Sequence, residues 1–229
     1  MVYYFKVCDN LFTRNDADMN EDEQTTLYMG KDKFENDYLI KHSNDENIWF
    51  HVDNMSSAHV YLQLTKKQLI ENLGFKDLTI EDSLLHIIGQ LTKANSIKGN
   101  KLNNITIIYT NVKNLLTDGS MDVGTVSFKN PKLVKRIFIE QRNNQIINAL
   151  NKTKSEISTE TFIENQKQLE KEILSHRKIE ETKLNELSKQ KQKDLEQKKD
   201  PYKDLFSEEN MQLSNNEGKD ENWVEDDFW

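Results

Sequence analysis

Two histidines, His51 and His59, stand on either side of a short polar turn and are the residues best placed to do chemistry together. If a three-residue turn joins two antiparallel strands there, His51 pairs with His59 and Trp49 pairs with Tyr61. Cross-strand partners share one face of a sheet, so the four rings and the Asp53 carboxylate would gather on that face. A change of one residue in the turn would destroy this alignment.

Three interpretations of this face stay open. Trp, Tyr and His rings stack on unpaired bases, which predicts a nucleic-acid-binding surface. Two histidines with Asp53 are acceptable metal ligands. The face could instead be half-buried, with its imidazoles satisfying backbone groups. We carry the nucleic-acid interpretation forward as the prediction and expect no bound metal.

Two polar, lysine-rich segments are candidates for contacts with phosphate groups. The first contains Lys31 and Lys33, and the second contains Lys93, Asn95, Lys98 and Lys101. Phosphate positioning needs cations and N–H donors but no particular order of residues. Together the two segments predict a charged rim, although a solvated loop explains either one alone.

The net charge of −8, from 31 basic and 39 acidic residues, is unevenly distributed. Residues 129–199 hold 17 basic and 11 acidic side chains (+6), whereas residues 200–229 hold 2 and 10 (−8). The basic segment is densest at Lys189, Lys191 and Lys193, which suits an RNA backbone or a merely solvated helix face. In the acidic tail, Trp223, Phe228 and Trp229 predict a linear motif for a protein partner, or for the chain's own basic arm.

The sequence offers little support for an enzyme. It has none of the phosphate-binding, dinucleotide-binding, zinc-protease or nucleophile-elbow motifs, and its single cysteine, Cys8, excludes a disulfide framework. We therefore expect a non-enzymatic protein without a cofactor. No apolar run reaches about 18 residues, so we expect no transmembrane segment and a cytoplasmic location, with the nucleus or a membrane periphery as alternatives.

The elements that must position these residues alternate between short strands and helices. Hydrophobic alternation predicts strands over 2–7, 25–29, 48–53, 58–64, 104–110, 123–128 and 133–140. Spacing predicts helices over 34–42, with Phe34, Tyr38 and Leu39 on the apolar side, and from a Thr79 N-cap to about 94. This mixture favours an α+β fold with a mostly antiparallel sheet and flanking helices.

The C-terminal third is predicted to leave that domain. Residues 143–199 contain no Gly or Pro and are rich in Gln, Lys, Glu and Leu, which predicts a long charged helix with a break at 155–161. A solvated helix is favoured over a coiled coil because no clean heptad seam runs through it, so dimerisation stays open. The predicted domains are 1–150, a helix over 151–200 and a disordered acidic-aromatic tail over 201–229.

Read as ordered motifs, the first 150 residues resemble the NFACT-R domain. Residues 28–37 (YMGKDKFEND), 48–53 (IWFHVD) and 56–61 (SSAHVY) carry the resemblance. Residues 93–97 and 121–124 are similar to its stand-alone eukaryotic branch, the coiled-coil domain-containing protein 25 family. Here the acidic 8–25 segment looks longer than in that family. The positions carried over are Gly30, Lys31, Asp32, Asn36, Asp37, Trp49, His51, His59 and Asn95.

What the resemblance implies is a non-enzymatic nucleic-acid-binding module. Multidomain relatives belong to ribosome-associated quality control, where RNA is the expected partner, and animal relatives are associated with DNA at a membrane surface. The leading hypothesis is therefore an RNA-binding accessory factor of translation. The alternatives are a protein-interaction scaffold that uses the helix and tail, or a DNA-binding protein.

Overall fold

A computed structural model of the chain describes residues 1–7, 25–71, 74–117 and 124–199, with side chains described through 195. Contacts between residues divide the chain into two compact units, Met1–His176 and Arg177–Trp229. The first unit carries the sheet and its helices. The sequence-based domain limits stay predictions, but residues 151–176 group with the folded unit.

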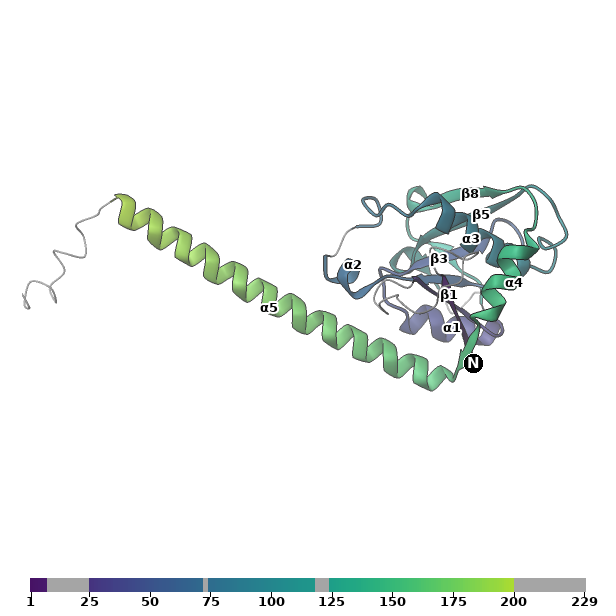
Figure 1. Ribbon diagram of the computed structural model, residues 1–229, viewed down its shortest axis with the longest axis horizontal. Helices are drawn as coiled ribbons and strands as arrows, with labels where there is room; N and C mark the ends of the chain where they lie inside the picture. The colour runs from purple at the N-terminus through teal and green to yellow at the C-terminus, as the bar shows by residue number, and fades with distance from the viewer. Residues whose placement is uncertain (8–24, 72–73, 118–123, 200–229) are drawn as a thin grey trace, which may run out of the picture. The chain divides into compact units, whose positions relative to one another are not determined.

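One antiparallel sheet organises the folded unit. Within the described residues its strands are β1 (Val2–Val7), β2 (Thr25–Gly30), β3 (Ile48–Val52), β4 (Val60–Gln63), β5 (Ile105–Asn111), β8 (Lys135–Ile139) and β9 (Ser155–Ile157). Their order is β8-β5-β3-β4-β2-β1-β9 (Figure 1). A separate two-stranded sheet pairs β6 (Leu115–Leu116) with β7 (Ser127–Phe128).

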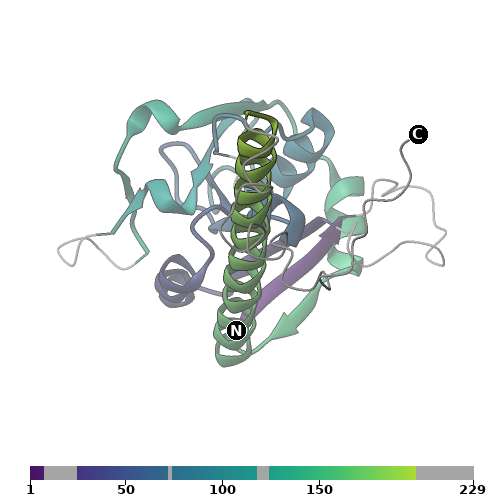
Figure 2. The ribbon, with the colours of Figure 1, turned by 90° about the vertical axis from the view of Figure 1, so that its left-hand side faces the viewer.

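Helices cover both faces of the large sheet. They are α1 (Lys33–His42), α2 (Lys66–Glu71), α3 (Asp82–Ala94), α4 (Asn144–Lys152) and α5 (Thr159–Lys199), with short 3-10 turns at Val112–Asn114 and Pro131–Leu133. Figures 1 and 2 show α3 and α4 on one face and α1 on the other. The central strands β2, β3, β4 and β5 are therefore buried on both faces over most of their length.

Two hydrophobic clusters follow from this layering. On the α3 side, Phe50, Val60 and Ile88 are completely buried in the larger cluster. On the α1 side, the smaller cluster joins Leu39 of α1 and Phe162 of α5 to sheet residues. Strands covered on both sides need apolar side chains at successive positions, and β3 and β4 have them.

The predicted fold class, an antiparallel sheet with flanking helices and a long C-terminal helix, is confirmed. Two details of the sequence-based assignment are wrong. Helix α3 begins at Asp82 after Glu81, which makes no side-chain cap bond, so Thr79 is not its N-cap. The strand predicted over 123–128 is limited to β7 (Ser127–Phe128), and residues 118–123 lie outside the described part of the chain.

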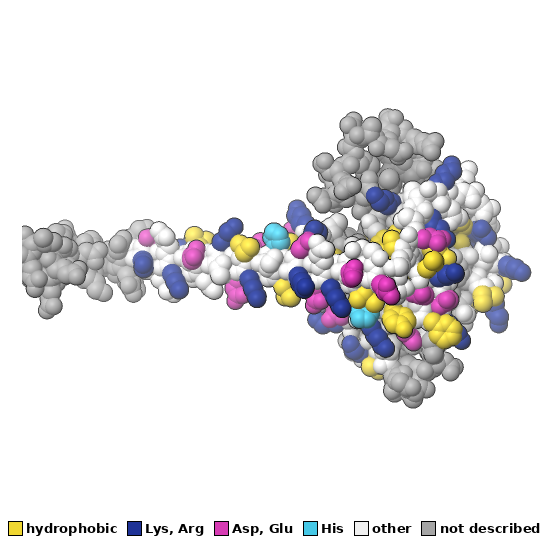
Figure 3. Space-filling view, turned by 90° about the horizontal axis from the view of Figure 1, so that it is seen from below, with side chains coloured by type: hydrophobic (Ala, Val, Ile, Leu, Met, Phe, Trp, Pro, Cys, Tyr) yellow, Lys and Arg dark blue, Asp and Glu magenta, His cyan; other side chains and the backbone are white. Residues whose placement is uncertain are grey.

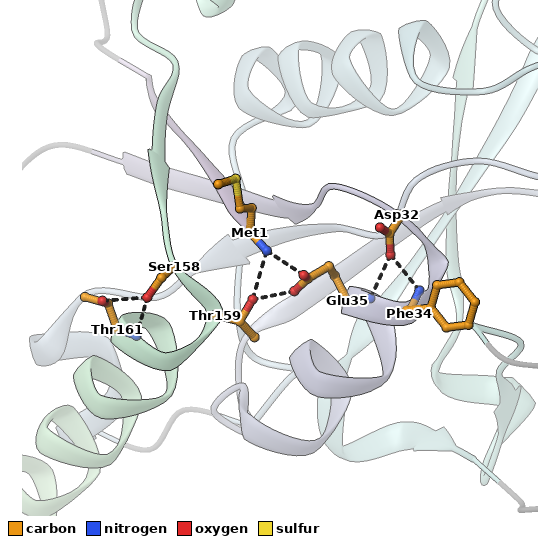
Figure 4. Close-up of polar contacts among 7 residues, drawn as sticks. All are labelled: Met1, Asp32, Phe34, Glu35, Ser158, Thr159 and Thr161. Atoms are coloured by element: carbon orange, nitrogen blue, oxygen red, sulfur yellow. Dashed lines mark hydrogen bonds and ion pairs between the residues drawn. The ribbon is translucent and has the colours of Figure 1, made fainter.

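The predicted break in the C-terminal helix is confirmed, and it contains a strand that joins the sheet. Between α4 and α5 the chain forms β9, which pairs with β1 and places Ile157 opposite Val2. Helix α5 then starts after Ser158, whose Oγ accepts a hydrogen bond from Thr161 N at 3.0 Å. The Thr159 hydroxyl donates to Glu35 of α1, and both contact the amino group of Met1 (Figure 4).

Candidate nucleic-acid interface

The paired strands β3 and β4 have the register that the sequence predicted. Trp49 lies opposite Tyr61, and the ring centroids of His51 and His59 are 5.3 Å apart in an edge-to-face arrangement. Trp49 stacks on His51 at 5.4 Å and meets His59 edge-on at 5.2 Å. The residues are therefore brought together on one face, as expected from their spacing.

That face is not available to a nucleic acid, which corrects the predicted stacking role. Trp49, His59 and Tyr61 are 1%, 2% and 0% exposed. Tyr61 stacks on Tyr28 at 4.8 Å, and Phe162 of α5 packs against Tyr28. Phe128 of β7 meets the Trp49 ring edge-on at 5.8 Å, so these rings are enclosed by other side chains and no base can reach their faces. We call Trp49, His51, His59 and Tyr61 the inner cluster.

Burial also controls the ionisation of the inner cluster. Removal from water lowers the pKa of His59 to about 3, with a smaller contribution from the nearby His51. Burial likewise lowers the pKa of His51 below its ordinary value. Both imidazoles are neutral near pH 7, so they carry no charge for a phosphate group. Trp49 Nε1, His59 Nδ1 and Tyr61 OH are buried without a hydrogen-bond partner among the described residues.

A different pair of aromatic residues is exposed. Phe34 and Tyr38 are 60% and 52% exposed on α1. They lie four residues apart, and Lys41 follows three residues later, so all three share a helix face. Lys31 and Lys33 are exposed just before them, with Lys33 Nζ 5.3 Å from the centroid of the Phe34 ring. We call Lys31, Lys33, Phe34, Tyr38 and Lys41 the α1 surface.

The predicted apolar side of α1 was therefore wrong for Phe34 and Tyr38 and right for Leu39. Phe34 and Tyr38 point outward, whereas Asn36 and Leu39 are buried. Asn36 fits inside because β2 ends in Gly30, where an added Cβ would lie 2.9 Å from Asn36 Oδ1. Phe34 and Tyr38 are each two residues from Asn36, about 200° around the helix, so they must point outward when Asn36 points inward. The sequence signal for this arrangement is Gly30, which leaves room for Asn36.

The acidic residues of α1 are engaged within the fold (Figure 4). Asp32 caps the helix by accepting hydrogen bonds from Phe34 N and Glu35 N, at 2.9 and 3.1 Å. The Glu35 carboxylate accepts from Thr159 and from the Met1 amino group. Asp37 accepts from Gly124 N at 3.2 Å. In the same view the Phe34 ring points away from these contacts, toward the outside of the helix.

The second predicted lysine-rich segment is partly exposed. Asn95, Lys98 and Lys101 are exposed, but Lys93 is completely buried and donates hydrogen bonds to the carbonyl oxygens of Gly99 and Leu102. Its predicted phosphate role is therefore wrong. Lys93 instead stabilises the turn after α3, where carbonyl groups lack helical partners, and burial lowers its pKa.

The fold brings the two exposed basic loops to the same end of the sheet. Gly30 ends β2 beside the start of β4, as the pairing of Met29 with Val60 shows. Asn95 O accepts a bond from Ala58 N at 3.0 Å, just before β4. The exposed members of this rim are Lys31, Lys33, Asn95, Lys98 and Lys101. Figure 3, from below, shows basic side chains beside exposed hydrophobic ones on the folded unit.

The basic end of α5 belongs to the second unit. Lys189, Lys191 and Lys193 are exposed, as are the apolar Leu184 and Leu187. Successive helical residues are about 100° apart, so Lys189 and Lys193 share a side and Lys191 lies opposite. The three lysines therefore form a general positive surface and no single stripe. Trp223, Phe228 and Trp229, the predicted protein-binding residues, lie outside the described residues.

The geometry bears on the metal ligands that the sequence suggested. Asp53, the third proposed ligand beside His51 and His59, lies 3.9 Å from Arg136 in an ion pair. In the part of the chain that the structure describes, His, Cys, Asp and Glu form no group of three or more suited to a metal ion. Within the same residues, no helix has the length and apolar character to cross a membrane.

Comparison with known proteins assigns the family. Residues 1–130 match the family model described as "NFACT protein RNA binding domain". "Coiled-coil domain-containing protein 25" of Bos taurus is 39% identical over 202 residues, covering 85% of this chain and 90% of the relative. The Mus musculus protein of that name is 48% identical over 131 residues, covering 57% and 60%. "Protein JLP2" of Saccharomyces cerevisiae is 41% identical over 136 residues, covering 57% and 61%. The matched segment contains the inner cluster, the α1 surface and both basic loops, and the chain belongs to the NFACT-R family.

Proposed function

We propose that this protein is a non-enzymatic RNA-binding protein that contacts unpaired bases through the α1 surface. The observation that carries the proposal is the exposure of Phe34 and Tyr38, more than half of each side chain, between three exposed lysines. Large aromatic side chains are usually buried or placed where a partner covers them. An exposed aromatic pair beside cations suits base stacking combined with phosphate contacts.

Single-stranded RNA fits this surface better than a duplex does. Aromatic rings stack on bases that have left the helix, and the bases of a duplex are already stacked on each other. Lys31, Lys33 and Lys41 would follow the backbone beside the stacked bases. The family description, which names RNA, supports the same partner.

The rest of the rim and the basic end of α5 would add affinity without base readout. Lys98 and Lys101 lie at the same end of the sheet as Lys31 and Lys33, and Lys189, Lys191 and Lys193 are exposed on α5. Lysine–phosphate contacts release counterions, so binding weakens steeply with salt. We propose that they extend the contact along a strand or along structured RNA.

The test is the affinity for a labelled single-stranded RNA across a salt series. Wild-type protein should bind tightly at low salt, and Lys31→Glu/Lys33→Glu/Lys41→Glu should weaken binding at least about tenfold. Lys76, Lys132 and Lys152 are exposed elsewhere on the folded unit, so their charge reversal provides a matched control. A DNA strand of the same sequence shows whether the partner is RNA or DNA. If the control variant loses as much RNA affinity as the Lys31/Lys33/Lys41 variant, the α1 surface is not a specific binding site.

In the cell we propose a role close to translation, in the cytoplasm, on RNA of the ribosome or its substrates. Crosslinking of bound RNA in cells, followed by sedimentation against ribosomal subunits, tests this location. Comigration with a subunit that is lost in the Lys31/Lys33/Lys41 variant would support it. Crosslinks to RNAs unrelated to ribosomes or translation would contradict it. A protein partner for the tail residues Trp223, Phe228 and Trp229 stays a separate proposal, tested by pull-down with their alanine variants.

A further inference from the structure

A groove of about 670 Å³ with a mixed polar and apolar lining lies between the early turns of α5 and the neighbouring strands of the sheet. This volume is within the range of about 300–1,000 Å³ typical of small-ligand sites. The whole groove belongs to the folded unit. Its walls consist of Tyr4, Lys6, Thr26, Gln63, Lys66, Ser155, Ile157, Asn165, Gln166, Gln168, Leu169 and Glu172.

Side-chain amides dominate the polar part of these walls. Gln63 comes from β4, and Asn165, Gln166 and Gln168 come from α5. An amide carries a donor and an acceptor side by side, which matches the hydrogen-bonding edges of nucleobases. Gln168 Nε2 already donates to Glu172 Oε1 at 3.2 Å, so the other three amides are the ones that favour a ligand with adjacent donors and acceptors.

Gln166 is a buried residue of the groove wall, and its amide oxygen is unpaired in the described part of the chain. It is 6% exposed, and its Oε1 atom has no hydrogen-bond partner among the described residues. A hydrogen bond with Gln166 lowers the pKa of Tyr4, although burial, the larger effect, raises it to about 12. The amide is therefore held on its Tyr4 side, and its Oε1 atom is buried within the groove wall, where a ligand donor can meet it only after the side chain turns toward the groove. An unpaired buried acceptor costs folding free energy, which a ligand with a matching donor would recover.

The charges at the groove suit an anionic ligand. The Lys6 side chain is exposed, and no carboxylate of the described residues lies within ion-pair distance of it. Glu172, the acidic residue in the wall, is paired with Lys66 at 2.7 Å, and this contact lowers its pKa. The negative charge of Glu172 is therefore offset, and Lys6 adds a positive charge near the mouth.

We propose that this groove holds one unpaired nucleotide of a bound RNA strand. The base would lie against Tyr4 with its edge on Gln63 and Gln166, and its phosphate would contact Lys6. This inference rests on the proposed function, because it adds a second contact to the same RNA. It differs from the α1 surface in being a hydrogen-bonding site, so it is selective among bases, whereas stacking is tolerant of sequence.

The experiment compares three full-length proteins by fluorescence anisotropy with labelled decamers of U, A, C and single-stranded mixed sequence. The groove variant is Gln63→Leu/Gln166→Met, and the matched control is Gln145→Met, an exposed glutamine on α4. We expect the groove variant to bind its preferred decamer about tenfold more weakly and to lose the preference among bases. The control should bind like wild type.

A second variant guards against misfolding. Lys6→Met changes an exposed side chain, so its melting temperature should stay close to that of wild type. Its salt slope for single-stranded RNA should fall by about 0.7, the loss of one phosphate contact. An unchanged slope, with unchanged base preference in the groove variant, would overturn the inference while RNA binding itself persists. Absence of RNA binding by wild type would instead overturn the proposed function.

Titration of free UMP and AMP into wild-type protein separates a strand nucleotide from a free one. Mononucleotides lack the contacts at the α1 surface, so we expect them to bind much more weakly than the decamers. The groove variant could lose tight binding of a mononucleotide and still bind the decamers with unchanged affinity. That result would contradict the assignment of the groove to a nucleotide of an RNA strand.

Discussion

The inner cluster and the α1 surface are both aromatic groups on the same side of the sheet, yet they have opposite surroundings. Trp49 and Tyr61 are almost completely buried, whereas Phe34 and Tyr38 are more than half exposed. The difference arises from what lies above each group. Trp49 and Tyr61 share one buried cluster with Leu39 of α1 and Phe162 of α5, while the outer face of α1 carries Phe34 and Tyr38. The aromatic residues of the inner cluster therefore stabilise the fold, whereas those of the α1 surface are accessible to a partner.

Truncation of an inner ring should have the largest effect. Trp49→Ala removes a ring that is 1% exposed, and we expect the free energy of unfolding to fall by about 3–5 kcal/mol. Urea denaturation monitored by circular dichroism measures it. The matched change on the outer group, Phe34→Ala, should alter stability by less than about 0.5 kcal/mol. Equal losses in the two variants would contradict the division between the groups.

Truncation of the outer pair should affect binding and leave stability unchanged. Stacking contributes about 1–3 kcal/mol per base, so Phe34→Ala/Tyr38→Ala should weaken binding to single-stranded RNA at least about tenfold. Filter binding at constant low salt measures this loss. Leu184→Ala/Leu187→Ala, on exposed apolar residues of α5, is the control. An unchanged Kd in the Phe34/Tyr38 variant would remove the α1 surface from the interface.

Acid should destabilise the protein through the inner cluster. The pKa of His59 is about 3 in the folded protein and 6.5 without the fold. As the pH falls, the unfolded chain binds a proton on His59 before the folded protein does. Titration of His59 therefore leaves the free energy of unfolding unchanged above pH 6.5 and decreases it as the pH falls from 6.5 toward 3. The limiting slope is about 1.4 kcal/mol per pH unit. Urea denaturation of wild type and His59→Gln at several pH values measures the free energy of unfolding against pH. The slope should be shallower for the variant, and identical slopes would show that His59 does not cause the loss of stability in acid.

The contact between α1 and α5 should have the smallest effect. The Thr159 hydroxyl donates to Glu35 at 2.5 Å and accepts from the Met1 amino group at 2.9 Å. Thr159→Val removes both hydrogen bonds, which lie at the surface, and should cost about 1 kcal/mol. Faster amide hydrogen exchange in the first turns of α5 would show that this contact holds the cover over Tyr28. Ser175→Ala removes a bond that Ser175 makes to Glu172 O in its own helix and serves as the control. Unchanged exchange in Thr159→Val would mean that packing of Phe162 alone is sufficient.

The sequence was most informative where the pattern is local. Alternation in β4 and the turn before it predicted the pairing of Trp49 with Tyr61, because both follow from neighbouring residues. The predicted strands β1 and β2 and the break before α5 rest on the same kind of signal. The fold class then followed from the order of these elements.

The exposure of the site residues could not be predicted in the same way. Tyr61 stacks on Tyr28, which Phe162 packs against from more than one hundred residues later, and Phe128 packs edge-on against Trp49; the local pattern around Trp49 and Tyr61 shows neither contact. Phe34 and Tyr38 have the spacing of a core stripe, but the close packing of Asn36 on Gly30 and the burial of Leu39 turn the opposite helix face inward. Lys93 resembles a surface cation, but the carbonyl groups of the following turn hold it inside.

Photocrosslinking tests the central claim, that the outer aromatic pair and not the inner one meets RNA, most directly. A single-stranded RNA carrying 4-thiouridine is irradiated with the wild-type protein, and the modified peptides are identified by mass spectrometry. We predict crosslinks on α1 at Phe34 or Tyr38, lost at high salt. Crosslinks at Trp49, His59 or Tyr61, with none on α1, would contradict the account.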